Sequence, residues 1–552
     1  MANESNNTVS NDFARKNKNL FFSGVLVLTV SNILIKVLGL LLKIPLTNMI
    51  GEEGMGYFNL AYSVYKWFYM VSTAGLPVAV SIMVSESRLR NRRLEVRQIY
   101  KVTMILFVIV GIIGSCAMFF GAGLFAKAQD VPKGRYCIMA IAPTLFFICI
   151  SSAIRGYFQG FQNMVPTAIS QIIEAAGKLT LGLLFGYYAL HVANNGEGYP
   201  IEYVAAFTIA GLTVGVLFGM VFLLVSKFIF RPIFNSAVEE DFEVRSTKTI
   251  AKILVITAIP ITISSSVMSL TDLFDSMIVI RQLKSIGFSD KVATELYGNY
   301  TSLAVPMFNM PPALIYPISY SIVPLLSGEI AAHGQTRVRQ IINSAMKIAL
   351  VIALPCALGM SVLSKPILSL LFHDEGMVDR GAPLLSILAL AVIFIGIIAI
   401  SNAVLQAHKL ERKPIISMIA GSVVKLVTSW ILVGTEGVGI YGTPISSVLC
   451  YLTIALVNLY FILRYVKVSL SFGSVILRPF LSAVLCALTA LGIYRLTLPL
   501  GHPKVFCLVS IFAAIIVYVI SLLILRAIRE EDVLLLPKGE KIAAFMKRKK
   551  LL

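Results

Sequence analysis

The sequence predicts an all-α polytopic membrane protein with about fourteen transmembrane helices, arranged as two six-helix lobes with two additional C-terminal helices. Three observations predict this fold. The 552 residues are 57% hydrophobic and only 14% charged, with a mean hydropathy of +0.84, which is far too apolar for a soluble chain of this length. The apolar residues gather in separate runs. The second half of the chain also repeats features of the first.

The apolar runs have the length of membrane-spanning helices, which need about 20 residues each. They are centred near residues 33, 70, 112, 147, 178, 215, 265, 312, 352, 395, 424, 452, 487 and 515. Most Lys and Arg residues lie at the two ends of the chain and in alternate loops, including residues 87–101 and 406–414. Because cytoplasmic loops carry an excess of Lys and Arg, this pattern predicts cytoplasmic termini.

A repeat relates the second run to the eighth. Aligning Tyr57 with Tyr297 without gaps also aligns Pro77 with Pro317. A repeat of six spans gives both copies the same orientation, and parallel repeats of this kind often meet around a central substrate site, as in transporters. The predicted parts are a cytoplasmic tail at 1–19, an N-terminal lobe at 20–235, a C-terminal lobe at 236–468, the additional helices at 469–526 and a basic cytoplasmic tail at 527–552.

The first run contains two lysines, Lys36 and Lys43, on one helical face with Gly39 between them. A cation inside a membrane costs about 2.5 to 3.5 kcal/mol on insertion scales, so it usually faces a protein interior or a watery cavity. We expect Lys36 to face a cavity. Lys43 either joins it or extends to the outer interface. Lys66, in the second run, is a further candidate cavity cation.

The fifth run contains Glu174 and Lys178 one helical turn apart, where they can form an ion pair. Such a pair is as consistent with a structural role as with a functional one. Lys425 follows a loop proline in the second lobe much as Lys178 does in the first, so it is the equivalent candidate cation there.

The seventh run carries Asp272 and Asp275 on one helical face, with Arg281 nearer the outer end. Two carboxylates this close together can form a proton or Na⁺ site. The alternative is that they form charge pairs with Lys36 or Lys425, and the sequence does not decide between the two.

The eighth run is rich in proline, including Pro311, Pro312 and Pro317, and Pro77 is the counterpart in the second run. Each proline removes a backbone donor, and broken helices at membrane depth are tolerated where they line a cavity. We expect these prolines to form a hinge; the alternative is a simple kink that serves packing.

Several classes of function are disfavoured. The net charge is +19, but the basic residues lie between the apolar runs, as signals of membrane topology do, and do not form a patch on a soluble domain. This distribution argues against nucleic-acid binding. The sequence has no phosphate-binding glycine loop, no metal-spaced histidine cluster and no nucleophile elbow, so we predict no catalytic residue, metal site or cofactor.

Three stretches carry a resemblance to a known family. They are "KVLG" at residues 36–39, "IGEEGMGYFNLAY" from Ile50, and "AGLPVAVSIMVSE" at residues 74–86. The chain resembles, over essentially its whole length, the multidrug/oligosaccharidyl-lipid/polysaccharide exporter superfamily, in the branch of SpoVB-like, YtgP-like and MurJ-like flippases. The resemblance implies a cationic central cavity for the pyrophosphate of a polyprenyl-linked sugar, with Lys36 matching a family cavity cation.

The resemblance therefore implies a flippase in a bacterial plasma membrane that moves such a precursor, lipid II for peptidoglycan as the first candidate, from the inner to the outer leaflet. Alternating access would be coupled to the membrane potential, H⁺ or Na⁺, and cell-wall synthesis proteins and membrane lipids would be its partners. The alternatives are a cation-coupled multidrug exporter, which the acidic residues Glu174, Asp272 and Asp275 would suit, a membrane-bound glycan enzyme, and a non-transporting scaffold.

Overall fold

The computed structural model describes the backbone of most of the chain. The described residues are 2–90, 92–192, 198–229, 245–332, 334–468, 471 and 473–527, with side chains described from residue 31 onward except at positions 33, 89 and 500. The predicted lobe boundary at 235/236 and the predicted tail beyond residue 527 lie outside these ranges. Within them the protein is helical and contains no β-strand, so the predicted all-α fold is confirmed.

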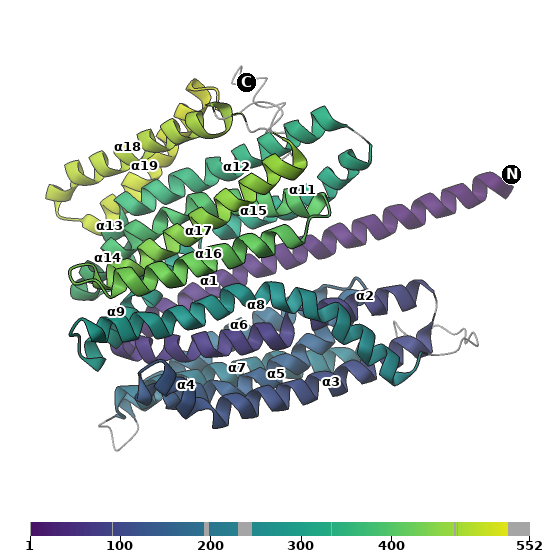
Figure 1. Ribbon diagram of the computed structural model, residues 1–552, viewed down its shortest axis with the longest axis horizontal. Helices are drawn as coiled ribbons and strands as arrows, with labels where there is room; N and C mark the ends of the chain where they lie inside the picture. The colour runs from purple at the N-terminus through teal and green to yellow at the C-terminus, as the bar shows by residue number, and fades with distance from the viewer. Residues whose placement is uncertain are drawn as a thin grey trace. The chain divides into compact units, whose positions relative to one another are not determined.

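The chain divides into two compact units, residues 1–276 and 277–552. Unit 1 contains seven helices, a 3₁₀ turn and most of an eighth helix (Figure 1). They are α1 (Ala2–Thr73), α2 (Leu76–Leu89), α3 (Arg93–Phe120), α4 (Ala122–Ala128), η1 (Pro132–Gly134), α5 (Arg135–Gly160), α6 (Val165–His191), α7 (Ile201–Ile229) and α8 (Thr247–Ser285), whose last residues belong to unit 2.

Unit 2 contains the remaining helices and short helical turns. They are α9 (Asp290–Asn299), η4 (Tyr300–Ala304), α10 (Val305–Phe308), α11 (Pro312–Ala331), α12 (Gln335–Val362), α13 (Ser364–Leu371), α14 (Glu375–Ala389), α15 (Ala391–Ala407), α16 (Arg412–Val433), η5 (Gly439–Tyr441), α17 (Gly442–Phe461), η6 (Ile462–Val466), η7 (Gly473–Leu477), α18 (Arg478–Thr497), η8 (Leu498–Leu500) and α19 (Pro503–Ile524).

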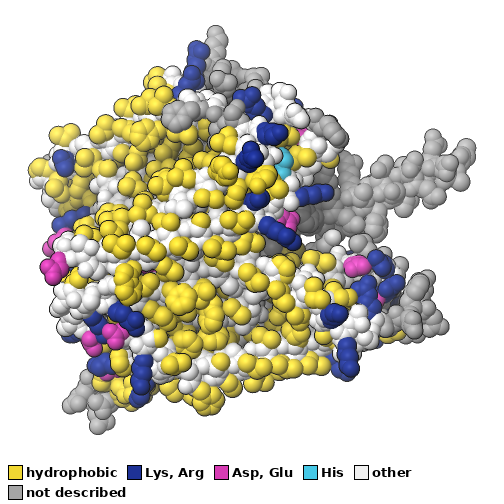
Figure 2. Space-filling model, viewed as in Figure 1, with side chains coloured by type: hydrophobic (Ala, Val, Ile, Leu, Met, Phe, Trp, Pro, Cys, Tyr) yellow, Lys and Arg dark blue, Asp and Glu magenta, His cyan; other side chains and the backbone are white. Residues whose placement is uncertain are grey.

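The protein is a multi-pass membrane protein. Of the helices in the described ranges, thirteen are long and apolar enough to cross a membrane. On the face shown in Figure 2, hydrophobic side chains cover the middle of the helices, while Lys and Arg side chains gather toward helix ends. The first of the thirteen, Leu34–Arg88, contains two of the predicted runs, so the predicted fourteen spans differ from the thirteen only in how this segment is counted.

Helix α1 reverses direction at Gly51, which separates those two runs. Gly51 has a φ of 68° and a ψ of −175°, a conformation that glycine adopts without the steric cost of a side chain. Lys43 Nζ lies 3.3 Å from Oδ1 of Asn59, whereas a continuous helix would separate these residues by about 24 Å along its axis. The first and second runs therefore form a helical hairpin. The predicted tail, from residue 2 to 19, is the first part of α1.

The first half of α8 packs into unit 1. Leu254 and Ala258 of α8 belong to a buried cluster with Leu76 and Val80 of α2 and Leu145 of α5. This apolar contact explains why the chain divides inside α8 rather than before it.

The predicted hinge prolines lie at breaks, with one exception. Pro77 is in the first turn of α2, directly after the interruption that ends α1 at Thr73. Pro311 and Pro312 lie where α10 ends and α11 begins, whereas Pro317 lies inside α11. Their role as a hinge stays a prediction.

The additional C-terminal helices α18 and α19 lie side by side in unit 2 (Figure 1). Helix α18 packs on α12, and the Tyr518 hydroxyl of α19 donates a hydrogen bond to the Val351 carbonyl of α12 across 2.7 Å.

Candidate functional site

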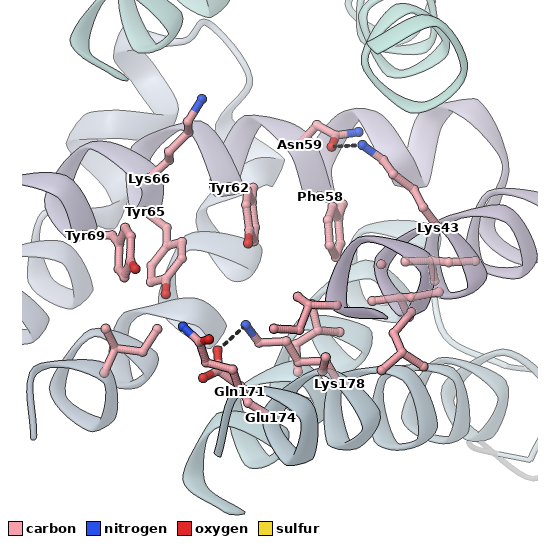
Figure 3. Close-up of a pocket in the computed structure, with 18 of the residues that line it drawn as sticks. Lys43, Phe58, Asn59, Tyr62, Tyr65, Lys66, Tyr69, Gln171, Glu174 and Lys178 are labelled. Carbon is pink, nitrogen blue, oxygen red and sulfur yellow. Dashed lines mark hydrogen bonds and ion pairs between the residues drawn. The ribbon is translucent and has the colours of Figure 1, made fainter. Parts of the chain in front are cut away.

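Unit 1 encloses a cavity of about 540 Å³ (Figure 3). Both halves of the α1 hairpin line it, together with α5, α6 and α7. The lining residues are Asn32, Ile35, Leu38, Gly39, Leu42, Lys43, Leu46, Phe58, Asn59, Tyr62, Tyr65, Lys66, Tyr69, Met70, Ile148, Arg155, Gln171, Glu174, Ala175, Lys178 and Leu212.

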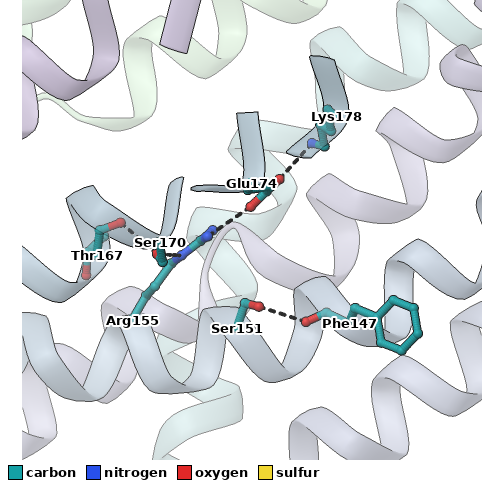
Figure 4. Close-up of polar contacts among 7 residues, drawn as sticks. All are labelled: Phe147, Ser151, Arg155, Thr167, Ser170, Glu174 and Lys178. Carbon is teal, nitrogen blue, oxygen red and sulfur yellow. Dashed lines mark hydrogen bonds and ion pairs between the residues drawn. The ribbon is translucent and has the colours of Figure 1, made fainter. Parts of the chain in front are cut away.

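Three charged side chains form a connected cluster in the wall of this cavity (Figure 4). Arg155 Nη2 of α5 lies 2.9 Å from Oε2 of Glu174, and Lys178 Nζ lies 2.7 Å from Oε1 of the same carboxylate. Arg155 and Glu174 are 8% and 9% exposed. Buried charges are tolerated when they are paired and hydrogen-bonded, as the charges of this cluster are. Two cations share one carboxylate, and the cluster keeps a net positive charge.

Hydrogen bonds to neutral groups hold Arg155 in this position. Its Nε donates to the Ser170 hydroxyl at 3.2 Å, and that hydroxyl donates to the Thr167 carbonyl at 2.7 Å (Figure 4). Because the guanidinium group is planar and is held at both Nε and Nη2, its orientation is fixed.

Close packing of α6 against α7 fixes the backbone of Lys178. A β-carbon on Gly215 of α7 would lie 2.4 Å from the Lys178 backbone nitrogen, and one on Gly177 would lie 2.9 Å from the Gly215 α-carbon. Small residues let helix backbones approach this closely in membrane proteins. The glycines therefore set the position of Lys178 in the cavity wall.

Two further cations line the cavity from α1. Lys43 donates a hydrogen bond to Oδ1 of Asn59 across the hairpin. Lys66 forms an ion pair with Asp272 of α8, and both side chains are partly exposed, at 42% and 34%. Asp272 thus has a partner within unit 1, Lys66, that differs from the two that the sequence suggests, Lys36 and Lys425. Its neighbour Asp275 is buried, at 6% exposure.

The structure therefore brings together Lys43, Lys66, Lys178 and Glu174 among the residues predicted from the sequence. Lys36 lies on α1, but its side chain is exposed and is not part of the lining.

The remaining predicted charges lie in unit 2. Lys425 is buried in α16, and Arg281 is exposed near the end of α8.

Sequence reasoning missed two parts of the site. The first is Arg155, whose signal was a lone arginine within an apolar run near a loop. The second is a row of four aromatic residues, whose spacing along the second half of α1 places them on one helical face. They are Phe58, Tyr62, Tyr65 and Tyr69.

The lining thus holds four cations and one carboxylate, among aromatic and amide side chains. Fixed cations in a partly buried site, where the effective dielectric constant is lower than that of water, attract an anion more strongly than they would in bulk solvent. The cavity is suited to a polar anionic ligand. In the part of the chain that the structure describes, no group of three or more His, Cys, Asp or Glu side chains is placed to hold a metal ion.

Comparison with known protein families gives two matches. A family model described as "Polysaccharide biosynthesis protein" matches residues 21–328. A second model, MatE, matches residues 301–431.

Two relatives align with most of the chain. "Stage V sporulation protein B" of Bacillus subtilis (strain 168) is 24% identical over 530 residues, which cover 94% of this chain and 98% of that protein. "Lipid II flippase MurJ" of the same organism is 24% identical over 421 residues, covering 73% of this chain and 76% of that protein.

Solved structures share the fold. A lipid II flippase MurJ in an inward closed conformation aligns with a TM-score of 0.65 at 15% identity, covering 90% of this chain and 98% of that one. An inward-facing multidrug resistance MATE family transporter of the MOP superfamily aligns with a TM-score of 0.62 at 16% identity, covering 78% and 95%.

Proposed function

Because the chain belongs to the polysaccharide biosynthesis protein family, we propose that it is a flippase for a polyprenyl-pyrophosphate-linked sugar precursor. It is a membrane transporter of the MurJ and SpoVB type, in the MOP superfamily. Lipid II, which the MurJ relative moves according to its name, is the first candidate cargo.

The cationic cavity of unit 1 is the observation that carries this proposal. A pyrophosphate is a compact anion, and Arg and Lys side chains make strong charge-assisted hydrogen bonds to phosphate oxygens. Such donors line a single cavity. They come from Lys43 of α1, Arg155 of α5 and Lys178 of α6. An anionic headgroup fits this arrangement.

The path of the cargo follows from its chemistry. The headgroup would cross in the hydrated cavity while the polyprenyl tail stays in lipid. Rocking of the two repeats would expose the site first to the inner and then to the outer leaflet. The termini would be cytoplasmic, and the membrane potential, H⁺ or Na⁺ would supply the energy. Cell-wall synthesis proteins would supply and consume the cargo.

A cation-coupled multidrug exporter is the second candidate, supported by the MatE match and the MATE-like fold. Such an exporter would use acidic residues to hold a cationic drug. Glu174 is paired with two cations and Asp272 is paired with Lys66, so these carboxylates are already neutralised. The cavity therefore favours an anion.

Transport by the purified protein in liposomes tests the proposal. A labelled polyprenyl-pyrophosphate-linked sugar is placed in the inner leaflet, and its appearance in the outer leaflet is followed with an impermeant reagent. We expect Lys178→Met to abolish transport and Lys178→Arg to retain it, because arginine keeps the charge and the phosphate donors. Lys365→Gln is the control, since Lys365 is exposed and lies outside the cavity.

Two results would contradict the proposal. One is equal transport by wild type and Lys178→Met. The other is movement of a cationic dye, but not of the lipid-linked sugar, which would favour the drug exporter.

A further inference from the structure

Four aromatic side chains form a continuous row along one wall of the cavity. Phe58, Tyr62, Tyr65 and Tyr69 follow one another at three- and four-residue intervals on the second half of α1, so they share one helical face. Neighbouring ring centroids lie 5.9, 5.4 and 5.9 Å apart along the row. In Figure 3 all four rings extend from α1 toward the α6 residues Gln171, Glu174 and Lys178.

The rings are held in fixed orientations. Phe58 and Tyr62 are parallel within 7°, and the next two pairs are tilted by 54° and 33°. Phe58 and Tyr65 are only 7% and 4% exposed, so their packing leaves little freedom to rotate. A ligand that stacks on the half-buried rings, Tyr62 and Tyr69, would meet a wall that their buried neighbours already order, and little conformational entropy would be lost on binding.

A polar group with unused hydrogen-bonding capacity faces the row. Gln171 of α6 lines the same cavity, and its Oε1 is buried without accepting a hydrogen bond from any residue that the structure describes. Buried side-chain oxygens in folded proteins nearly always have a partner, so one without a partner points to a ligand or a solvent molecule at that place. The amide offers an acceptor and two donors to such a ligand.

An aromatic wall opposite a free amide fits a sugar ring. A pyranose has apolar C–H faces, which carry a small positive charge and lie well against the negative face of an aromatic ring. Its edge carries hydroxyl groups, which need hydrogen-bond partners such as an amide. Ligand sites commonly combine an apolar surface with a few placed polar groups in this way.

We propose that Phe58, Tyr62, Tyr65, Tyr69 and Gln171 form a subsite for the sugar rings of the cargo. The inference rests on the proposed function and adds to it. The cations hold the pyrophosphate, and the aromatic row selects a lipid whose pyrophosphate carries a carbohydrate. A sugar-free polyprenyl pyrophosphate fills only the first half of the site.

Binding measurements with two lipids test the subsite. The probes are a polyprenyl pyrophosphate and the same lipid carrying one N-acetylhexosamine, each titrated into purified protein. We expect wild type to bind the sugar-bearing lipid about tenfold more tightly, as one to two stacked rings and an amide hydrogen bond would give. Tyr62→Leu should remove this preference, and Tyr62→Phe should keep it, because stacking needs the ring and not the hydroxyl.

Two further variants separate the sugar subsite from the anion site. Gln171→Leu should weaken binding of the sugar-bearing lipid alone, whereas Lys178→Met should weaken binding of both lipids. Trp67→Leu is the matched control, since Trp67 lies on the same segment of α1 but does not line the cavity. Melting temperatures of all variants, compared with that of wild type, check that they are folded.

The outcomes are distinguishable. Equal affinity of wild type for the two lipids would overturn the sugar subsite and leave the anion site standing. The sugar subsite would also be overturned if Tyr62→Leu lost affinity for both lipids equally. The ring would then contribute to pyrophosphate binding or to folding, and not to sugar recognition. Binding of neither lipid by wild type would overturn the proposed function together with this inference.

Discussion

Arg155 of α5 and Glu174 of α6 are joined by an ion pair of 2.9 Å in the wall of the unit 1 cavity. Lys178 holds the other oxygen of the same carboxylate at 2.7 Å. The carboxylate thus lies between two cations, where an oxygen of a phosphate would also be bound. On the proposed function, Glu174 and an incoming anion would compete for the same donors.

Glu174→Gln should lower the melting temperature and strengthen anion binding. Removing one partner of a buried charge network typically costs about 3 to 5 kcal/mol, and access of solvent to the cavity reduces that cost here. The two cations left behind are then free for a ligand. We expect inorganic pyrophosphate to raise the melting temperature of this variant more than that of wild type.

Lys365→Gln is the control for that measurement. Lys365 and Asp379 form an ion pair with side chains 64% and 56% exposed. Exposed pairs contribute only about 0 to 1 kcal/mol, so its melting temperature should hardly change. The prediction that Glu174 competes with the anion is wrong if pyrophosphate raises the melting temperature of Glu174→Gln no more than that of wild type.

Lys43→Met should weaken binding of pyrophosphate more than Lys36→Met does. Lys43 lines the cavity, whereas Lys36 is exposed outside the lining. Calorimetric titration of both variants in detergent measures the difference. A larger loss in Lys36→Met would assign the anion site to the face of α1 that the sequence resemblance implies.

Gly215→Ala should reduce both stability and transport. Its β-carbon would lie 2.4 Å from the Lys178 backbone nitrogen, so α6 and α7 must separate and Lys178 must move. Gly123→Ala is the matched control, because no atom lies within 4 Å of its added β-carbon. Thermal melting and liposome transport of the two variants check the prediction, and equal behaviour of the two would show that α6 does not need this close contact.

Replacing Pro311 and Pro312 together by alanine should slow transport without changing pyrophosphate binding. The two prolines lie at the break between α10 and α11, and alanine would let the helix continue through it. The anion site in unit 1 is untouched. Pro479→Ala, in the first turn of α18 where proline fits a helix, should keep normal transport. Unchanged transport by the double variant would show that Pro311 and Pro312 do not form a hinge that transport needs.

The membrane fold could be predicted because the length and spacing of apolar runs reflect the bilayer itself. The same logic identified Lys43, Lys66 and Lys178, since a lysine inside an apolar run needs a polar environment. The sequence could not predict which of these lysines line the cavity, because that depends on how the helices pack. Lys36 and Lys43 share one helical face, and sequence does not say which positions along that face a cavity reaches, so it favours Lys36 although only Lys43 is in the lining.

Arg155 and the aromatic row were missed for different reasons. Arg155 lies one and a half turns from the end of α5, where an arginine usually reaches the membrane surface, but its side chain is buried and bonded to Ser170 and Glu174 of α6. Tyrosines are common in membrane helices, so the regular spacing from Phe58 to Tyr69 carried no signal until the cavity was located.

All lining residues of the cavity lie between Asn32 and Leu212. Membrane proteins are inserted as they are synthesised, N-terminus first. Every residue that lines this cavity is therefore synthesised before the first residue of unit 2. Unit 1 would hold all of these side chains while the helices of unit 2 are still being made.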